Sequence, residues 1–203
     1  VGQKVNMTFE FTSALMGACA IDATGNPLPD ETLSLLFKSD AVLFGAIGDP
    51  RFDNDPKAKV RPEQGLLRMR KELGLFANIR PIHVYKTMVD KTPLKPEMIE
   101  GVDFVVFREL TGGIYFGEKG RRDEGHTAFD NCVYTREEIV RIARLALETA
   151  RGRAKKLLLV DKANVLESSR LWRETVQAME KDLVGGKILY SDSTHIKANA
   201  NKR

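Results

Sequence analysis

The chain has 203 residues, of which 32 are Lys or Arg and 28 are Asp or Glu, so its formal net charge is +4. Apolar residues make up 42% and charged residues 30%, which is typical of a globular protein and excludes a disordered or low-complexity chain. This length suits one medium domain or two small ones, with a sizeable core. Because basic and acidic residues are interspersed, the small positive charge does not indicate nucleic-acid binding, and we expect no nucleic-acid partner.

The cysteines and histidines lie too far apart for a disulfide scaffold or a zinc finger. Cys19 and Cys132 are separated by more than half the chain, and no histidine stands beside either at zinc-ligand spacing. No apolar run approaches the roughly 20 residues that span a bilayer, and the first residues lack a signal-peptide pattern. We therefore expect a cytoplasmic protein with no membrane partner.

The first 75 residues mix short apolar runs with turn signals. Residues 1–13 alternate apolar and polar side chains and predict a half-buried strand, and residues 41–47 predict a second strand. A helix capped by Asp30 is expected up to Lys38, followed later by a surface loop over residues 51–59. Residues 61–74 predict a helix with proline in its first turn and glycine at its end.

Beyond residue 75 the pattern predicts strands first and then a hairpin. Residues 75–84 and 102–107 are strand candidates, separated by a proline-containing linker. Residues 114–117 and 131–134 predict the two arms of a hairpin, with the charged segment 118–130 exposed between them.

Two helices and a strand complete the pattern. Thr135 and Glu138 form a capping box, after which apolar residues recur with the helical period. Residues 157–160 are wholly apolar and predict a central parallel strand buried on both faces. A further helix is expected from about residue 167 to 180. The alternation of strands and helices predicts an α/β protein.

Five side chains are candidates for chemistry. Lys162 follows a predicted strand at the end where open α/β sheets bind ligands, so it is either a general base or a surface lysine. Arg70, Arg80 and Arg108 could hold a small dicarboxylate, or each could be a solvated surface residue. Tyr115 lies between two glycine clusters, where it is either a proton donor or an amphipathic strand residue.

Four runs resemble the 3-isopropylmalate dehydrogenases, of the isocitrate/isopropylmalate dehydrogenase family. They are RPEQGLLRMRK at 61–71, LFANIRP at 75–81, RELTGGIYFG at 108–117 and VDKANVLE at 160–167. The resemblance covers about residues 5–181, nearly nine tenths of the chain. It implies oxidation and decarboxylation of 3-isopropylmalate with NAD and Mg²⁺ or Mn²⁺, in leucine biosynthesis.

The resemblance also implies a partial fold of this family in two domains. Residues 1–75 match an incomplete α/β domain on the cofactor side, and residues 76–182 match a second α/β domain for substrate binding and dimerisation. The segment 114–134 resembles an intersubunit arm, so the resemblance implies a homodimer.

Roles for individual residues are likewise implied by the resemblance. Arg70, Arg80 and Arg108 match the arginines that bind the substrate carboxylates, while Lys162 matches the general base and Tyr115 the acid. Leu66 and Leu67 match residues that face the isopropyl group of the substrate. The matches to residues near the cofactor are Glu63, Asn164, Asp49, Pro50, Arg51, Phe52 and Asp53.

Both ends of the chain depart from the family pattern. The glycine-rich first strand is missing, and so are the metal-binding aspartates, so we expect a truncated chain with no metal ligands of its own and little or no turnover. Residues 183–203 instead resemble a DDE-type transposase, with Asp192 at the place of a catalytic carboxylate. The alternative is an ordinary strand over residues 187–190 and a polar tail.

Two rival functions stay open. One is a related decarboxylating dehydrogenase for tartrate, malate or homoisocitrate, although Leu66 and Leu67 argue against the more polar substrates. The other is a non-catalytic remnant that dimerises with intact subunits.

Overall fold

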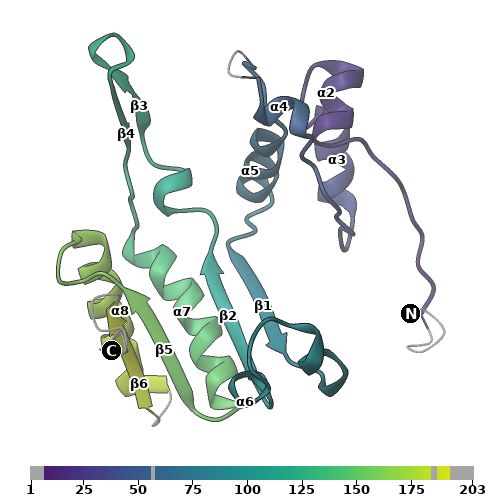
Figure 1. Cartoon of the computed structure of the whole chain (residues 1–203). Coiled ribbons are helices and arrows are strands. Elements are labelled where there is room, and N and C mark those ends of the chain that lie inside the picture. Colours follow the sequence, from purple (N-terminus) through teal and green to yellow (C-terminus); the bar gives the residue numbers. More distant parts are fainter. Residues whose placement is uncertain (1–6, 56–57, 184–186, 193–203) are drawn as a thin grey trace. The chain divides into compact units, whose positions relative to one another are not determined.

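Contacts within the chain divide it into two compact units, Val1–Leu75 (unit 1) and Phe76–Arg203 (unit 2). The computed structural model describes residues 7–55, 58–183 and 187–192. Over those residues unit 1 is helical, and unit 2 combines helices with strands (Figure 1). The predicted α/β composition is confirmed.

Unit 1 consists of helices packed on a small apolar core. The helices are α2 (Ala18–Thr24), α3 (Asp30–Lys38), α4 (Pro50–Asp53) and α5 (Pro62–Glu72). Leu28, Leu33 and Met69 form the core, which links the loop before α3 to both long helices. Helix α5 begins with proline as predicted, whereas Asp30 is the first helical residue of α3 rather than its cap.

Two segments of unit 1 that were predicted as strands form neither helix nor strand. Residues 7–13 are exposed, and residues 1–6 of the same prediction lie outside the described residues. Residues 41–47 are almost entirely exposed as well. A strand needs a neighbouring strand to satisfy its backbone N–H and C=O groups, and the described part of unit 1 contains none.

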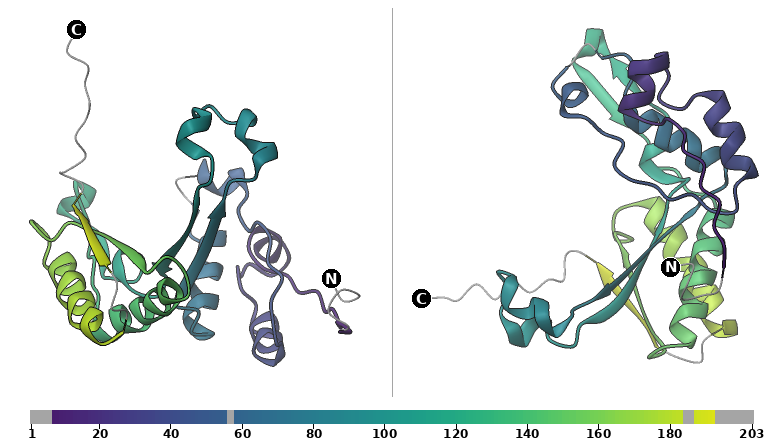
Figure 2. Two further views of the ribbon diagram at one scale, coloured as in Figure 1. Left: turned by 90° about the horizontal axis from the view of Figure 1, so that it is seen from below. Right: turned by 90° about the vertical axis from the view of Figure 1, so that its right-hand side faces the viewer.

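Unit 2 begins with the two predicted strands, which the structure shows to be an antiparallel pair. Strand β1 (Ala77–His83) pairs with β2 (Asp103–Glu109) in a register that runs from Ala77 opposite Glu109 to His83 opposite Asp103. The linker between them folds into η1 (Lys86–Lys91) and α6 (Pro96–Ile99), which lie at one end of the twisted β1–β2 ribbon (Figure 2).

The hairpin that follows lies farther along the arm than predicted. Its elements are η2 (Gly113–Tyr115), β3 (Lys119–Arg122), η3 (Asp123–Gly125) and β4 (Thr127–Asp130). The segments predicted as its strands, 114–117 and 131–134, are not strands. The first is partly helical, because η2 includes Ile114 and Tyr115. They still meet, since the N–H of Gly113 donates to the carbonyl of Val133 at 2.7 Å.

Helices α7 (Arg136–Arg151) and α8 (Glu167–Leu183) provide the main core of unit 2. The predicted capping box is present, because Thr135 Oγ1 accepts the Glu138 N–H at 3.2 Å and Glu138 Oε2 accepts the Thr135 N–H at 2.8 Å. The predicted stripe on α7 is buried at every position, namely Ile139, Ile142, Ala143, Ala146, Leu147 and Ala150. It packs against Val176 of α8 and against side chains of the next strand.

That strand, β5 (Lys156–Asp161), is covered on one face only. It pairs in parallel with β6 (Lys187–Asp192), and Leu157 and Leu159 pack against the α7–α8 core. On the other face Leu158 is 57% exposed and Val160 is 72% exposed. The predicted strand therefore exists, but the prediction that it is buried on both faces is wrong, because α7 and α8 lie against one face.

At the base of the arm, Gly113 sits against Tyr134. A Cβ atom on Gly113 would lie 2.4 Å from Tyr134 Oη, and the φ angle of Gly113 is +74°. The Tyr134 ring meets that of Trp172 edge-on, with centroids 5.4 Å apart. Burial raises the pKa of Tyr134 above its usual value, so the phenol stays protonated in this contact.

The one-sided burial of β5 is tested by two matched truncations. We expect Leu147→Ala to lower the free energy of unfolding by about 2–5 kcal/mol, because Leu147 is fully buried in the core. Leu158→Ala should lower it by less than about 1 kcal/mol, because that side chain is largely exposed. Urea unfolding measures both, and equal losses would mean that the outer face of β5 is covered.

The close approach at Gly113 is tested against a second glycine of positive φ. Gly113→Ala should lower the free energy of unfolding by about 2–4 kcal/mol, from backbone strain together with overpacking against Tyr134. Gly125→Ala carries only the backbone strain, because φ is +96° there and nothing lies within 4 Å of the added Cβ. A loss no greater for Gly113→Ala than for Gly125→Ala contradicts the predicted contact.

Candidate functional site

The register of β1 and β2 brings two of the predicted arginines to one face of the sheet. Arg80 lies opposite Val106 and Asn78 lies opposite Arg108, and residues directly opposite in an antiparallel pair point to the same side. Both arginines are exposed, and Arg80 Nε donates to Asn78 Oδ1 at 2.6 Å. Two neighbouring guanidinium groups on an open face can bind carboxylates through charge-assisted hydrogen bonds.

Tyr115 joins these arginines from the η2 turn. The Arg108 Cζ atom lies 5.3 Å from the centroid of the Tyr115 ring, and the ring is half exposed. The alternative that Tyr115 is a strand residue is wrong, because it ends a short 3-10 helix. The structure thus places a phenol beside Arg108, one of the two arginines predicted to bind carboxylates.

Lys162 and Asn164 lie in the turn that follows β5. The carbonyl oxygen of Lys162 accepts the N–H groups of Val165 and Leu166, each at 3.0 Å. Lys162 is half-buried and Asn164 is exposed. Strands β2 and β5 point the same way in Figure 1, so this turn and the Arg108 strand end lie on the same side of unit 2.

The remaining predicted substrate residues lie on α5 in unit 1, together with Glu63, which was predicted to bind the cofactor. Glu63, Leu66, Leu67 and Arg70 are spaced by three and four positions, so they share one face of that helix. Leu66 also packs against the unit 1 core, and Glu63 is exposed. Because Arg70 belongs to a different unit from Arg80 and Arg108, the gathering of all three arginines stays a prediction.

The predicted cofactor stretch Asp49–Asp53 forms a short capped helix rather than the expected loop. Asp49 Oδ1 accepts the N–H of Arg51 at 3.0 Å, and this hydrogen bond lowers the pKa of Asp49 below its usual value. The Arg51 guanidinium binds Asp22 at 3.0 Å and stacks over Phe52, with Cζ 5.5 Å from the ring centroid. Pro50 begins the helix, which is largely exposed and leaves the Asp53 carboxylate open to hydroxyl or amide groups.

Two buried carboxylates at strand ends were not singled out from the sequence. Glu109 is the last residue of β2 and Asp161 the last of β5, and their side chains are 1% and 2% exposed. The alternation of faces along a strand could have predicted their burial. Glu109 lies two residues after the half-buried Phe107, and Asp161 lies two residues after Leu159, so each shares a strand face with an apolar side chain.

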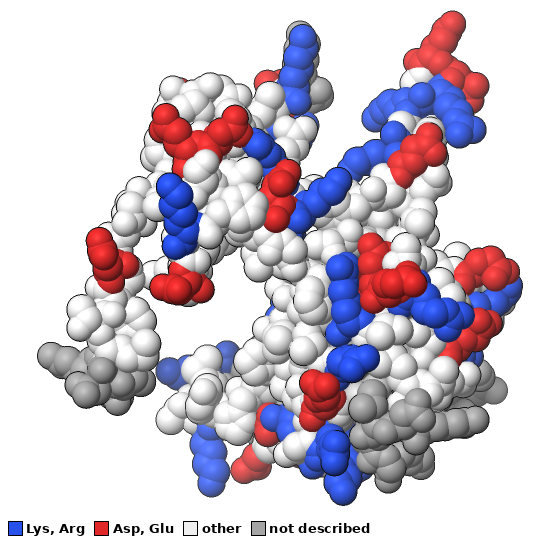
Figure 3. Space-filling model, turned by 180° about the vertical axis from the view of Figure 1, so that it is seen from behind, with Lys and Arg blue, Asp and Glu red and all other residues white. Residues whose placement is uncertain are grey.

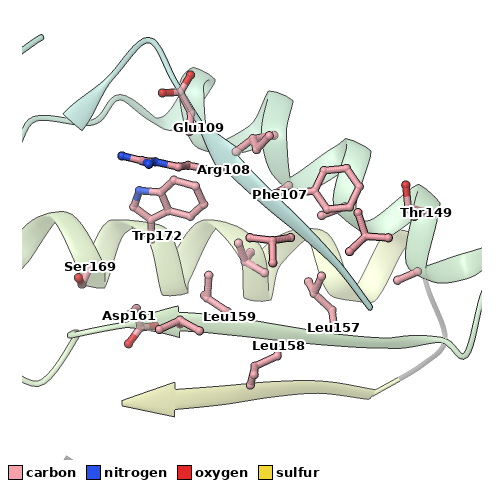
Figure 4. Close-up of a pocket in the computed structure, with 18 of the residues that line it drawn as sticks. Phe107, Arg108, Glu109, Thr149, Leu157, Leu158, Leu159, Asp161, Ser169 and Trp172 are labelled. Carbon is pink, nitrogen blue, oxygen red and sulfur yellow. The ribbon is translucent and has the colours of Figure 1, made fainter. Parts of the chain in front are cut away.

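A cavity of about 1220 Å³ runs between β2 and β5 (Figure 4). Its walls are mostly apolar and include Phe107, Leu157, Leu158 and Trp172. Arg108 also lines it, at the end where β2 stops. Asp103, Thr149 and Arg153 line the opposite end of the cavity, so polar groups lie at both ends and the apolar side chains lie between them.

Three further observations concern the surface charge, possible metal-ligand clusters and the hydropathy of the helices. On the face drawn in Figure 3, acidic and basic side chains are interspersed. Within residues 7–55, 58–183 and 187–192, no three His, Cys, Asp or Glu residues are grouped so that they could hold a metal ion. None of the helices among these residues is long and apolar enough to cross a membrane.

Comparisons with known proteins give the same family from sequence and from structure. The family model described as isocitrate/isopropylmalate dehydrogenase matches residues 1–199, so most of the segment 183–203 lies inside the match. A 3-isopropylmalate dehydrogenase of Bacteroides fragilis is 57% identical over 178 residues, which are 88% of this chain and 49% of that protein. One of Priestia megaterium is 51% identical over 185 residues, 90% of this chain and 50% of that protein.

Two crystal structures show the same fold. An isocitrate dehydrogenase from Methylococcus capsulatus matches with a TM-score of 0.72 at 25% identity, covering 94% of this chain and 53% of that one. A beta-decarboxylating dehydrogenase from Thermococcus kodakarensis matches with a TM-score of 0.60 at 31% identity, covering 90% and 48%. The chain spans about half the length of the curated relatives it matches. Its sequence and its fold together show that the chain belongs to the isocitrate/isopropylmalate dehydrogenase family.

Proposed function

We propose that this chain is part of an enzyme that oxidises and decarboxylates 3-isopropylmalate with NAD, in leucine biosynthesis. The relatives at 51–57% identity that are named 3-isopropylmalate dehydrogenase support this choice. The structural observation that carries it is the shared face of Arg80 and Arg108, with Tyr115 beside Arg108. That face offers two guanidinium groups and a phenol to one small diacid.

Binding rests on charge at one end of the substrate and on apolar contact at the other. Arg80 and Arg108 hold carboxylates, and Arg70 supplies a third guanidinium from α5. Leu66 and Leu67, on the same helix face as Arg70, form an apolar wall for the isopropyl group. Malate and tartrate lack this alkyl group, so they gain nothing from that wall.

Proton transfer is assigned to Lys162 and Tyr115. The Lys162 amine accepts the proton of the substrate hydroxyl during oxidation. After CO₂ leaves, the Tyr115 hydroxyl donates a proton to the enolate carbon. We place these two groups in a site shared between two subunits, so that each subunit of a homodimer completes the other's site.

The cofactor contacts fall on exposed polar groups. Asp49–Asp53 and Glu63 in unit 1 and Asn164 in unit 2 can bind hydroxyl and amide groups of NAD. When bound, NAD supplies the hydride acceptor. A Mg²⁺ or Mn²⁺ ion belongs to the proposed reaction, but the described residues contain no cluster of three or more His, Cys, Asp or Glu that could hold it, so no step is derived through the metal.

The proposal is tested in a full-length chimera of the B. fragilis relative. In it, the aligned part of this chain replaces the corresponding 178-residue segment of that protein. We expect NADH formation with 3-isopropylmalate and Mg²⁺, and a kcat/KM at least about tenfold lower with malate, tartrate or homoisocitrate. Arg108→Gln should lower kcat/KM by about 100-fold, because the substrate loses a charge-assisted hydrogen-bond partner. The exposed Arg144→Gln on α7 is the matched control and should change it by less than about twofold. Preference for a polar substrate, or equal effects of the two variants, contradicts the proposal.

We also infer that the arm, residues 114–134, joins two copies of the chain. The support is its extended β3–β4 hairpin and the resemblance of this segment to an intersubunit arm (Figure 1). Replacing residues 119–130 by a short Gly-Ser turn should convert a dimer into a monomer in sedimentation velocity, whereas Gly125→Ala should leave the dimer intact. A wild-type monomer, or a dimer that survives the replacement, contradicts this inference.

The likeness of residues 183–203 to a transposase stays a prediction. Residues 184–186 and 193–203 lie outside the described residues. Strand β6 forms a parallel ladder with β5 and the family match reaches residue 199, which favours the ordinary-strand alternative. The flanking DNA decides between them, because transposase sequence downstream supports the resemblance and dehydrogenase sequence contradicts it.

A further inference from the structure

Strands β2 and β5 end in the same arrangement, a buried carboxylate beside a predicted site residue. Glu109 follows Arg108, and Asp161 precedes Lys162. Neighbouring residues of a strand point to opposite faces, so within β2 Glu109 faces the helices while Arg108 faces away. Asp161 is the last residue of β5, and Lys162 is the first residue of the turn that follows it. Figure 4 shows Arg108 and Glu109 leaving the end of β2 in different directions, with Asp161 at the corresponding end of β5.

Glu109 fixes the turn that leads from Arg108 to Tyr115. Its carboxylate accepts the N–H of Thr111 at 2.8 Å, the Thr111 hydroxyl at 2.9 Å and the N–H of Gly112 at 2.6 Å. Arg141 of α7 completes the set with a bond from Nη2 to Glu109 Oε1 at 2.5 Å, and it also bonds the Thr111 hydroxyl. This one side chain therefore ties the first residues after β2 to helix α7.

Asp161 does the same for the turn that carries Lys162 and Asn164. It accepts the N–H of Ala163 at 3.1 Å. Arg173 of α8 binds both of its oxygens, from Nε to Oδ2 at 3.0 Å and from Nη2 to Oδ1 at 2.6 Å. The turn between β5 and α8 is thus fixed to α8 through a bidentate ion pair.

Stability alone is a poor reason for two such pairs. Desolvation of a buried ion pair cancels much of its Coulomb attraction, and apolar residues of similar size often serve a core equally well. A carboxylate that accepts several backbone N–H groups does, however, select one conformation of a turn. Both selected turns lead directly to residues of the proposed site.

We propose that Glu109–Arg141 and Asp161–Arg173 are positioning pairs, which orient Arg108 with Tyr115 and Lys162 with Asn164. This inference rests on the proposed function for the roles of those four residues. Glu109 and Asp161 act through their neighbours and touch no substrate. Loss of the first pair weakens carboxylate binding, and loss of the second misplaces the base.

A third ion pair offers a control in the same elements. Asp103 begins β2 and binds Arg153, just beyond the end of α7, at 2.7 Å, on the opposite end of the strand from Arg108. The hydrogen bond from Arg153 holds the pKa of the Asp103 carboxyl below its usual value, so this pair is charged at neutral pH. Asp103→Asn therefore removes an ion pair from β2 without touching the turns after the strands.

Kinetics of the chimera separate positioning from structural support. Glu109→Gln should raise KM for 3-isopropylmalate at least about tenfold with a smaller change in kcat, and Asp161→Asn should lower kcat at least about tenfold with a smaller change in KM. Asp103→Asn should change neither by more than about twofold. Arg141→Lys and Arg173→Lys keep the charge but lose the guanidinium geometry, so they should give smaller effects in the same directions.

Hydrogen exchange in the 203-residue chain gives a readout independent of turnover. We expect the amides of Thr111 and Gly112 to exchange at least about tenfold faster in Glu109→Gln, and that of Ala163 in Asp161→Asn, with no change in Asp103→Asn. If exchange changes as expected but the wild-type chimera is inactive, the proposed function is contradicted. The conclusion that the two carboxylates fix the conformation of the turns then still holds. Unchanged exchange, or the same KM and kcat as Asp103→Asn in an active chimera, overturns the positioning role.

Discussion

The pairing of β1 with β2 is the constraint on which the candidate site depends. A strand has only two faces, so a shift of the register by one residue would move every β2 side chain to the opposite side relative to β1. The observed register puts Arg80 and Arg108 on one face and sends Glu109 toward α7. Helix α7 in turn is held by its buried apolar stripe, so the placement of the arginines derives from ordinary core packing.

How far the sequence predicted the fold depended on whether a signal was local. The capping box and the apolar period of α7 are properties of one segment, and both were predicted correctly for the helix that follows Thr135. The strands predicted at 1–13 and 41–47 failed, because a strand exists only with a partner that sequence alternation cannot supply. Likewise the apolar run of β5 showed that it is a strand, but not that Leu158 faces outward.

The candidate site was predictable to a similar degree. Arginines near element ends and a lysine after an apolar strand were predicted as site residues, and the structure puts Arg80 and Arg108 on one face of unit 2, with Tyr115 beside Arg108. Glu109 and Asp161 were not predicted to support the site, because most glutamate and aspartate side chains in proteins are exposed to solvent. Only the α7 and α8 arginines that reach Glu109 and Asp161 show that these carboxylates are buried and paired.

The strand alternation that hides those carboxylates also explains why they recur. The last residue of each strand is buried against the helix layer and lies next to a residue of the proposed site, so it controls the turn that follows. An apolar neighbour would fill the layer but leave the N–H groups of the turn without an acceptor. A carboxylate satisfies those N–H groups and needs a cation, which α7 provides to β2 and α8 provides to β5. Rigid helices thereby fix the two turns that a binding site needs to hold still.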